Sequence, residues 1–365
     1  MGAVTFLGGL PLAEPVIEAM RAAAGQKVDL NELNLAAGRR IAELTGAQAA
    51  FVTTGAAAGL QLAAAACLTG SDVARIARVP EIRGERSRIV IHRKHRCNFD
   101  HAIRATGARL VEFGYARDRT ELWELEDALD GQTAAVAYIA NFSDSSSVLS
   151  LEQVVAAAHE REIPVFVDTA VSLPPASNLR DIPATGADLC CFSGGKAVGG
   201  PQNTGFIVGR ADLVAACSLN ANPNHNTIGR PLKVNAESIA GLLVALEDYA
   251  VRDHEADARR WREVLERVRE LAGLSDDEPG WRIADSSHQM PIPALHVRIR
   301  GGADAAGAAA SVLSDGNPAV WVGVETDELV VNPHALMLED VDLVGERLGA
   351  LVRGILPAEG RDGGG

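Results

Sequence analysis

A run of short apolar segments that alternates with helical stretches, from about residue 34 to residue 210, constrains the fold of this chain more than any other feature. Such alternation is typical of an α/β domain with a mainly parallel sheet. In sheets of this kind, ligands bind at the carboxyl ends of the strands. The sequence predicts strands at 49–52, 88–91, 109–112, 134–139, 165–167 and 189–192, and helices at 34–45, 56–68 and 151–161.

The pattern changes after residue 234. Residues 235–271 form a long charged helical stretch, expected as two helices or one bent helix, that leads into a C-terminal α/β part. That part is expected to contain strands near 294–299, 319–324 and 328–331 and a helix at 341–355. We therefore predict an N-terminal segment (1–33) that contributes to the small domain or a dimer interface, a large cofactor-binding domain (34–234), a connecting helix with a small domain (235–356), and a disordered tail (357–365).

Charge and cysteine usage exclude several classes of protein. The 34 basic and 48 acidic residues give a net charge of −14, which argues against a nucleic-acid partner. No stretch of about 18 uncharged apolar residues is present, so no membrane span or membrane partner is expected. No basic region precedes the first apolar run, so no signal peptide is expected. The five cysteines have no metal-binding spacing, which predicts reduced thiols, a cytoplasmic protein and no metal.

The strongest chemical signal is a lysine inside a glycine-rich turn. The segment Ser193-Gly-Gly-Lys196-Ala-Val-Gly-Gly-Pro-Gln202 directly follows the apolar strand at 189–192. It is not a nucleotide-binding P-loop, because the lysine is followed by alanine rather than serine or threonine. An isolated lysine in a turn is usually a solvated surface residue. Four glycines and a proline close by favour a functional lysine instead.

A second signal lies 28 positions upstream, where the apolar strand at 165–167 ends in Asp168. A carboxylate at the end of a buried strand is costly unless it has a partner. In pyridoxal-phosphate (PLP) enzymes this partner is the pyridinium nitrogen, while a lysine forms the Schiff base. A turn or helix-capping aspartate is the alternative interpretation. The pair Asp168 and Lys196, each at a strand end, is more specific than either residue alone.

The third signal is a turn of small residues, Thr53-Thr54-Gly55-Ala56, between a strand and an alanine-rich helix. The first N–H groups of a helix are unpaired, and together with the helix dipole they form a cradle for phosphate. An ordinary helix start is the alternative. Ahead of an Asp/Lys pair, the turn would supply a third anchor for the cofactor.

These residues carry a family resemblance. The chain resembles the fold-type I PLP-dependent enzymes, in the group that includes bacterial selenocysteine synthase (seryl-tRNA selenium transferase) and D-glucosaminate-6-phosphate ammonia-lyase. The resemblance implies a large domain with a mainly parallel central sheet plus a smaller C-terminal α/β domain. The similar segments are 5–9, 28–33, 41–46, 52–59, 95–107, 165–170, 193–205 and 229–234.

The resemblance also implies roles for individual residues. Lys196 falls on the Schiff-base lysine and Asp168 on the strand-end aspartate, while His95 falls on a histidine that lies over the cofactor ring. The remaining positions implied to bind the cofactor are Thr53, Thr54, Gly55, Ala56, Ala170, Ser193, Gly200 and Gln202.

The chain departs from the family pattern in two places. Gly195 stands where the family usually has an aspartate, so the position next to the lysine has lost a carboxylate. The resemblance starts near residue 4 and lacks the tRNA-binding region of the seryl-tRNA enzyme. Together with the acidic charge, this argues against a tRNA substrate.

Cations for an anionic substrate are expected after the polar loop at 220–227. Arg230, Lys233 and His225 are the candidates, because arginine matches a carboxylate or phosphate with two hydrogen bonds. For Arg230 an ordinary surface position is the equal alternative. His92 and His101, near His95, are interpreted as structural.

The sequence therefore predicts a PLP-dependent lyase that acts on an amino acid or amino sugar acid. Lys196 would remove the α-proton, a β-leaving group would depart, and the products would be a keto acid and ammonia. An aminotransferase, racemase, aldolase or β-replacement enzyme with the same cofactor is the alternative, and an inactive scaffold protein is the non-enzyme alternative. A homodimer or larger even-numbered assembly is expected, with residues 5–9 and the Gly-Gly-Pro-Gln turn crossing the interface.

Overall fold

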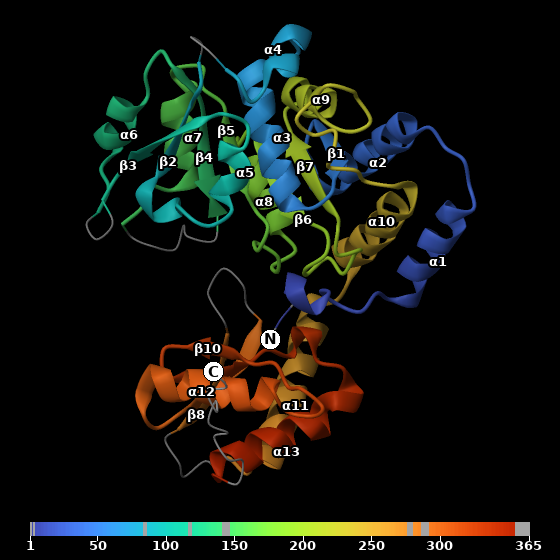
Figure 1. Cartoon of the computed structure of the whole chain (residues 1–365), viewed down its shortest axis with the longest axis vertical. Coiled ribbons are helices and arrows are strands. Elements are labelled where there is room, and N and C mark those ends of the chain that lie inside the picture. The colour runs from blue at the N-terminus through green and yellow to red at the C-terminus, as the bar shows by residue number, and fades with distance from the viewer. Residues whose placement is uncertain are drawn as a thin grey trace, which may run out of the picture. The chain divides into compact units, whose positions relative to one another are not determined.

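The computed structural model describes residues 2, 4–82, 86–115, 119–140, 147–275, 280–285 and 292–354. The chain divides into two compact units (Figure 1): a larger one, Leu10–Arg252, and a smaller one, Met1–Gly9 together with Asp253–Gly365. The tail predicted at 357–365 lies outside the described residues.

The division falls between two helices, α10 (Ala236–Val251) and α11 (His254–Ala272). The charged stretch after residue 234 is therefore two helices, one of the two arrangements expected. Helix α10, which the sequence analysis grouped with the small domain, belongs by its contacts to the larger unit. There it packs against α1 (Glu14–Ala24).

Seven strands form the sheet of the larger unit, in the order β1-β7-β6-β5-β4-β2-β3. Strands β2 to β6 pair in parallel, whereas β7 runs antiparallel to both β1 and β6. The expected α/β fold with a mainly parallel sheet is confirmed, and β7 is a strand that the sequence pattern did not predict. The bounds are β1 Ala49–Thr53, β2 Arg88–His92, β3 Arg109–Phe113, β4 Thr133–Ile139, β5 Val165–Asp168, β6 Leu189–Ser193 and β7 Gly205–Gly209.

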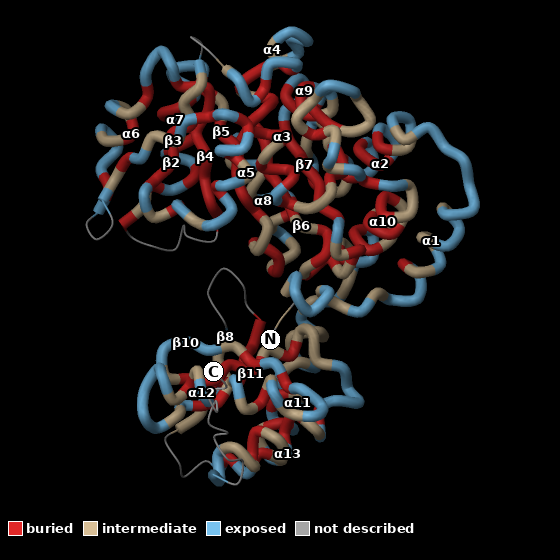
Figure 2. Tube along the Cα trace, in the orientation of Figure 1, coloured by how far each residue is buried: buried red, intermediate tan, exposed pale blue. Residues whose placement is uncertain are grey.

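Helices cover both faces of this sheet, and each face has its own apolar cluster (Figures 1 and 2). Alternate residues of a strand point to opposite faces, so Phe166 packs on the side of α3, whereas Val165 and Val167 pack on the side of α7. We call these the α3 face and the α7 face. The remaining helices of the unit are α2 Leu30–Thr45, α3 Ala56–Thr69, α4 Val73–Arg78, α5 Asp100–Arg104, α6 Leu122–Ala128, α7 Leu151–His159, α8 Asn178–Ala184 and α9 Ala211–Asn220.

The starts of the helices follow local capping chemistry. Asp29 accepts hydrogen bonds from the Asn31 and Glu32 N–H groups at the start of α2. Ser150 and Gln153 form a reciprocal capping box at the start of α7. Helix α3 differs from these two, because its N-cap residue is Gly55, which provides no side-chain cap. Its first N–H groups therefore remain available to another acceptor.

The smaller unit has an antiparallel sheet in the order β10-β11-β9-β8. Leu295, Val297 and Leu329 pack from this sheet against the helices. The strand predicted at 319–324 is wrong over most of its length, because β10 begins only at Gly323 and the Val320 N–H donates to the Leu313 carbonyl instead of to a strand. The bounds are β8 Trp281–Asp285, β9 Pro293–Arg298, β10 Gly323–Glu325, β11 Glu328–Val331, α12 Gly302–Ser314 and α13 Val341–Val352.

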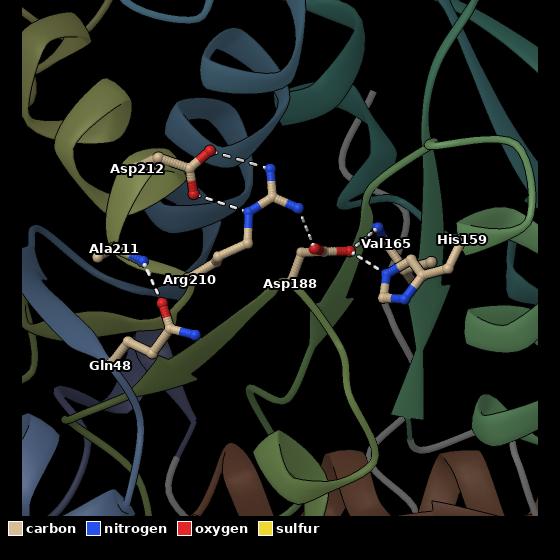
Figure 3. A network of polar contacts seen from close by, with 7 residues as sticks. All are labelled: Gln48, His159, Val165, Asp188, Arg210, Ala211 and Asp212. Atoms are coloured by element: carbon tan, nitrogen blue, oxygen red, sulfur yellow. Dashed lines mark hydrogen bonds and ion pairs between the residues drawn. The ribbon is translucent and has the colours of Figure 1, made fainter.

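A polar network closes the edge of the large sheet where the parallel strands begin (Figure 3). Asp188, buried just before β6, accepts hydrogen bonds from the Val165 N–H at 2.7 Å and from His159 Nε2 at 2.8 Å. Its other carboxylate oxygen accepts from Arg210 Nη1 at 2.7 Å, and Arg210 also holds the exposed Asp212. One carboxylate thus ties together β5, β6 and the end of β7.

Removing this carboxylate should destabilise the larger unit. We expect Asp188→Ala to lower the free energy of unfolding by about 1–3 kcal/mol, because the buried Val165 N–H loses its acceptor. Asp212→Asn removes only the exposed partner of the same arginine and should change stability by less than about 0.5 kcal/mol. Urea denaturation measures both values. Equal losses in the two variants would contradict an anchoring role for Asp188.

Candidate active site

Three polar side chains end neighbouring strands at the opposite edge of the sheet. Thr53 of β1 and Ser193 of β6 both pair with Gly205 of β7, and Asp168 of β5 pairs with Cys191 of β6. Residues two apart on a strand point to the same face of a sheet. The three side chains lie two residues beyond members of the α3-face cluster, namely Phe51, Cys191 and Phe166, so all three point to the α3 face. The structure therefore brings Thr53, Ser193 and Asp168 to one edge and one face.

The turn into α3 provides a cradle at this edge. Gly55 has a φ of +100°, a conformation that favours glycine, and a Cβ added there would meet nothing within 4 Å. The Thr53 hydroxyl donates to the Gly55 carbonyl at 2.9 Å and so fixes the turn. Thr54 is half-buried and Ala56 begins the uncapped helix. Open space in front of free N–H groups and a helix dipole is suited to an anion such as a phosphate.

Asp168 is a buried carboxylate at the end of β5, with an exposed fraction of 7%. Its Oδ1 accepts a hydrogen bond from the Ala170 N–H at 2.9 Å, so Ala170 acts on the carboxylate through its backbone. Burial raises the pKa of Asp168, while the Ala170 hydrogen bond and the positive charge of Lys196 oppose the rise. A carboxylate in this position is suited to a cationic partner.

Lys196 lies in the turn that follows β6, and it is half-buried. The turn is closed by hydrogen bonds from the Gly194 N–H to the Thr204 carbonyl and from the Gly200 N–H to the Gly194 carbonyl. The backbone donor of Gly200 is therefore used inside the turn. Burial lowers the pKa of Lys196, and the charge of Asp168 opposes that shift. A lowered pKa increases the fraction of neutral, nucleophilic amine.

The glycine at position 195 is required by the packing of the same turn. A Cβ added to Gly195 would lie 2.6 Å from Gln202 Cα and 2.7 Å from Gln202 Oε1. Real Cβ atoms do not come this close, so an aspartate at 195 would displace residue 202. Gln202 thus occupies the space that a side chain at 195 would need. The lack of a carboxylate at position 195 therefore matches the way the turn packs.

His95 is buried in the turn that follows β2. Its ring packs against Tyr138 with centroids 4.5 Å apart, and its Nδ1 accepts from the Ile139 N–H at 3.4 Å. Tyr138 belongs to the α7-face cluster, whereas Asp168 points to the α3 face. Burial lowers the pKa of His95 to about 3, and the ring is 1% exposed. The place of His95 over a cofactor ring therefore stays a prediction.

Cys97, two residues further along, lies between β2 and α5 and is half-buried. Burial raises the pKa of its thiol, and the negative charge of Asp168 adds to the rise. The sequence analysis interpreted Cys97 only as a reduced thiol. The available sequence signal for Cys97 was its position shortly after the end of the strand predicted at 88–91.

The predicted substrate cations lie elsewhere in the larger unit. Arg230, Lys233 and His225 belong to the loop between α9 and α10, which packs beside the middle of α3 where Gly229 approaches Leu62. Arg230 Nη1 donates to Asn222 Oδ1 at 3.3 Å, while Lys233 and His225 are exposed. The structure does not show them joined to Thr53, Asp168 and Lys196.

Two further searches concern the described residues only. In those ranges, no group of three or more histidine, cysteine, aspartate or glutamate side chains is arranged to hold a metal ion. No helix in the described part of the chain is long and apolar enough to cross a membrane.

Comparison with known proteins gives a consistent result. The family model of L-seryl-tRNA selenium transferase matches residues 3–270. A 5'-C-glycyluridine monooxygenase-decarboxylase from a Streptomyces species is 34% identical over 362 residues, which cover 95% of this chain and 88% of the relative. A D-glucosaminate-6-phosphate ammonia lyase from Salmonella typhimurium is 33% identical over 294 residues, or 77% of each chain.

Solved structures agree with the sequence matches. A structure of D-glucosaminate-6-phosphate ammonia-lyase has a TM-score of 0.82 and 28% identity, and the match covers 97% of this chain and 94% of that one. A serine palmitoyltransferase with a bound PLP–myriocin adduct has a TM-score of 0.58 at 16% identity, with coverage of 95% and 85%. The second likeness concerns the fold alone.

Proposed function

The chain belongs to the L-seryl-tRNA selenium transferase family of PLP-dependent enzymes, and we propose that it is a lyase that eliminates a β-leaving group from an amino acid or amino sugar acid. One observation carries the proposal. The buried Asp168 carboxylate ends β5, and Lys196 lies in the turn after the paired strand β6, at the sheet edge where Thr53 and Ser193 also end.

The residues at this edge fit pyridoxal phosphate. The open cradle at Gly55 and the uncapped start of α3 suit its phosphate, with the Ser193 hydroxyl at the same edge. The buried Asp168 carboxylate suits its protonated ring nitrogen, and the half-buried Lys196 amine suits its aldehyde as a Schiff base. When bound, PLP withdraws electrons from the bonds at the substrate α-carbon.

The chain's own groups then perform the proton work. The lowered pKa of Lys196 suits its amine to accept the α-proton as a general base. The Asp168 carboxylate, held by the Ala170 N–H, keeps a proton on the ring nitrogen. The leaving group departs from the β-carbon, and hydrolysis releases a keto acid and ammonia. The substrate class is supported by the lyase relative, whose name specifies an amino sugar acid phosphate.

We also propose a homodimer or larger even-numbered assembly in the cytoplasm. Fold-type I sites are usually completed by a second subunit, and residues 5–9 and the Gln202 turn are the segments proposed to reach it. The five cysteines are all free thiols, which is consistent with a reducing compartment. Light scattering on the active protein tests the proposed assembly. A fully active monomer would contradict it.

Product analysis tests the reaction. Purified protein loaded with PLP is incubated with D-glucosaminate 6-phosphate and with β-hydroxy amino acids, without any keto-acid acceptor. We expect equal amounts of ammonia and a 2-oxo acid to form. Turnover that begins only after a keto acid is added would identify an aminotransferase instead. Protein that binds no PLP would contradict the whole assignment.

A decarboxylase is the second candidate, because the relative with that activity in its name matches 95% of this chain against 77% for the lyase. Measuring carbon dioxide release and oxygen uptake in the same incubations separates the two reactions.

A further inference from the structure

A cavity at the start of α5 has no role in the reaction described so far. It is a widely open depression of the surface with a volume of about 490 Å³. The residues that line it are Arg96, Cys97, Asn98, Asp100, His101 and Arg104. Three of the six side chains are basic or can become so, and only one is acidic.

The acidic residue is already neutralised. Asp100 is buried and accepts a hydrogen bond from Arg96, which also pairs with Glu112 on β3. Arg104 differs: within the part of the chain that the structure describes, it has no carboxylate partner, and its Nη2 contacts only His101 Nδ1 at 3.4 Å. The cavity therefore presents one uncompensated guanidinium with a histidine beside it.

The position of α5 brings this cavity to the candidate active site. Ile103 of α5 packs in the α3-face cluster together with Leu60 of α3 and Phe166 of β5, and α5 contacts α3 directly (Figure 1). The side chain of Asp168 points to this same face. Helix α5 also follows β2 at the edge where the parallel strands end. The cavity and the Asp168 carboxylate thus share a face and an edge of the sheet.

Cys97 connects the two places. It lines the cavity and belongs to the segment between the end of β2 and α5, at the edge of the sheet where β5 ends in Asp168. A molecule that reacts above Asp168 would therefore extend past Cys97 toward His101 and Arg104. Arginine and histidine are suited to a phosphate or carboxylate, to which arginine donates two parallel hydrogen bonds.

We propose that the cavity lined by Cys97, His101 and Arg104 is the subsite for the anionic end of the substrate, a phosphate or second carboxylate remote from the reacting amine. The inference rests on the proposed function and specifies its substrate class as an amine with a distal anion. Arg104 here takes the role that the sequence analysis gave to Arg230. It would act as a binding residue and not in the chemical step.

The thiol of Cys97 allows a test that needs no turnover. Cys97 is partly exposed beside an open cavity, whereas Cys190, Cys191 and Cys217 are fully buried. Alkylation of the PLP-loaded protein by N-ethylmaleimide, followed at Cys97 by peptide mass spectrometry, reports occupancy of the cavity. The probe is 6-phosphogluconate, a phosphorylated sugar acid without an amine, with gluconate as the phosphate-free comparison.

We expect saturating 6-phosphogluconate to slow alkylation of Cys97 at least fivefold, and gluconate to be less effective. In Arg104→Gln the concentration needed for protection should rise roughly 10- to 100-fold, as for loss of a charged hydrogen bond. Arg109→Gln is the matched control, because Arg109 is exposed at the opposite edge of the sheet, and it should behave as the wild type. Absence of protection, or protection unchanged in Arg104→Gln, would overturn the proposal.

The outcome is separable from that of the proposed reaction. Protein that shows the Arg104-dependent protection but releases no ammonia would keep the subsite and lose the lyase activity. Protein that releases ammonia while Arg104→Gln has no effect on protection would keep the reaction and lose the subsite.

Discussion

Lys196→Ala is expected to reduce kcat by about 10⁴-fold or more, because one substitution removes both the amine that holds the cofactor and the general base. The variant should still bind PLP through the α3 cradle and Asp168, but reversibly. Two measurements check this. Borohydride reduction should attach PLP to wild-type protein at Lys196 and leave the variant unlabelled, and gel filtration should strip the cofactor from the variant.

The control for this prediction is Lys27→Ala, which removes an exposed lysine ahead of α2. It should retain wild-type absorbance and turnover. Covalent labelling at another lysine in the Lys196 variant, together with residual activity above about 1% of the wild type, would assign the chemistry elsewhere. General acid–base groups typically contribute 10²- to 10⁴-fold, so a loss below tenfold would also contradict the assigned role.

Asp168→Asn should have the second largest effect. The substitution keeps the shape of the side chain and an acceptor for the Ala170 N–H. It removes the negative charge that keeps the ring nitrogen of the cofactor protonated. We expect kcat to fall by at least about 10²-fold, comparable to the loss of a preorganised electrostatic group. PLP should still attach to Lys196, so borohydride labelling should persist. Asp181→Asn, at an exposed position of α8, is a suitable control.

The same variant should be at least as stable as the wild type when the cofactor is absent. Burial raises the pKa of Asp168 in the folded chain above that of the unfolded chain, so the folded state binds this proton more readily. The cost of the ionised carboxylate is therefore absent at pH below the unfolded pKa of about 4 and develops as pH rises through the folded pKa. Thermal melts should show the advantage of Asp168→Asn at neutral pH and its disappearance toward pH 4. A destabilised variant at neutral pH would contradict this account.

The large sheet was predictable from sequence because its parallel strands are short apolar runs between helices with clear periodicity. Strand β7 was missed for a physical reason. Its Gly-Phe-Ile-Val-Gly sequence has a glycine at each end, and the strand is recognisable only when its neighbours β1 and β6 are in place. The segment 319–324 shows the reverse case, since Val320 and Val322 are buried but the Val320 N–H bonds to the end of α12.

The residues of the site that lie at strand ends were predictable from the alternation of side chains along a strand. Thr53, Asp168 and Ser193 each end a strand, so their edge follows from the chain direction and their face from the alternation of side chains. His95 lies beyond the end of β2 in a short 3-10 turn, Arg93–His95, and the course of such a turn decides which residue faces inward. The sequence contains no periodic signal for that choice.

The division of the chain into units has a consequence for biosynthesis. The larger unit is one uninterrupted segment, Leu10–Arg252, whereas the smaller unit combines the first nine residues with everything after Arg252. Phe6, from the start of the chain, packs edge-on against Trp321 with ring centroids 5.2 Å apart. Because chains emerge from the ribosome N-terminus first, the larger unit can fold while synthesis continues. The opening segment must wait for its partners until almost the whole chain has been translated.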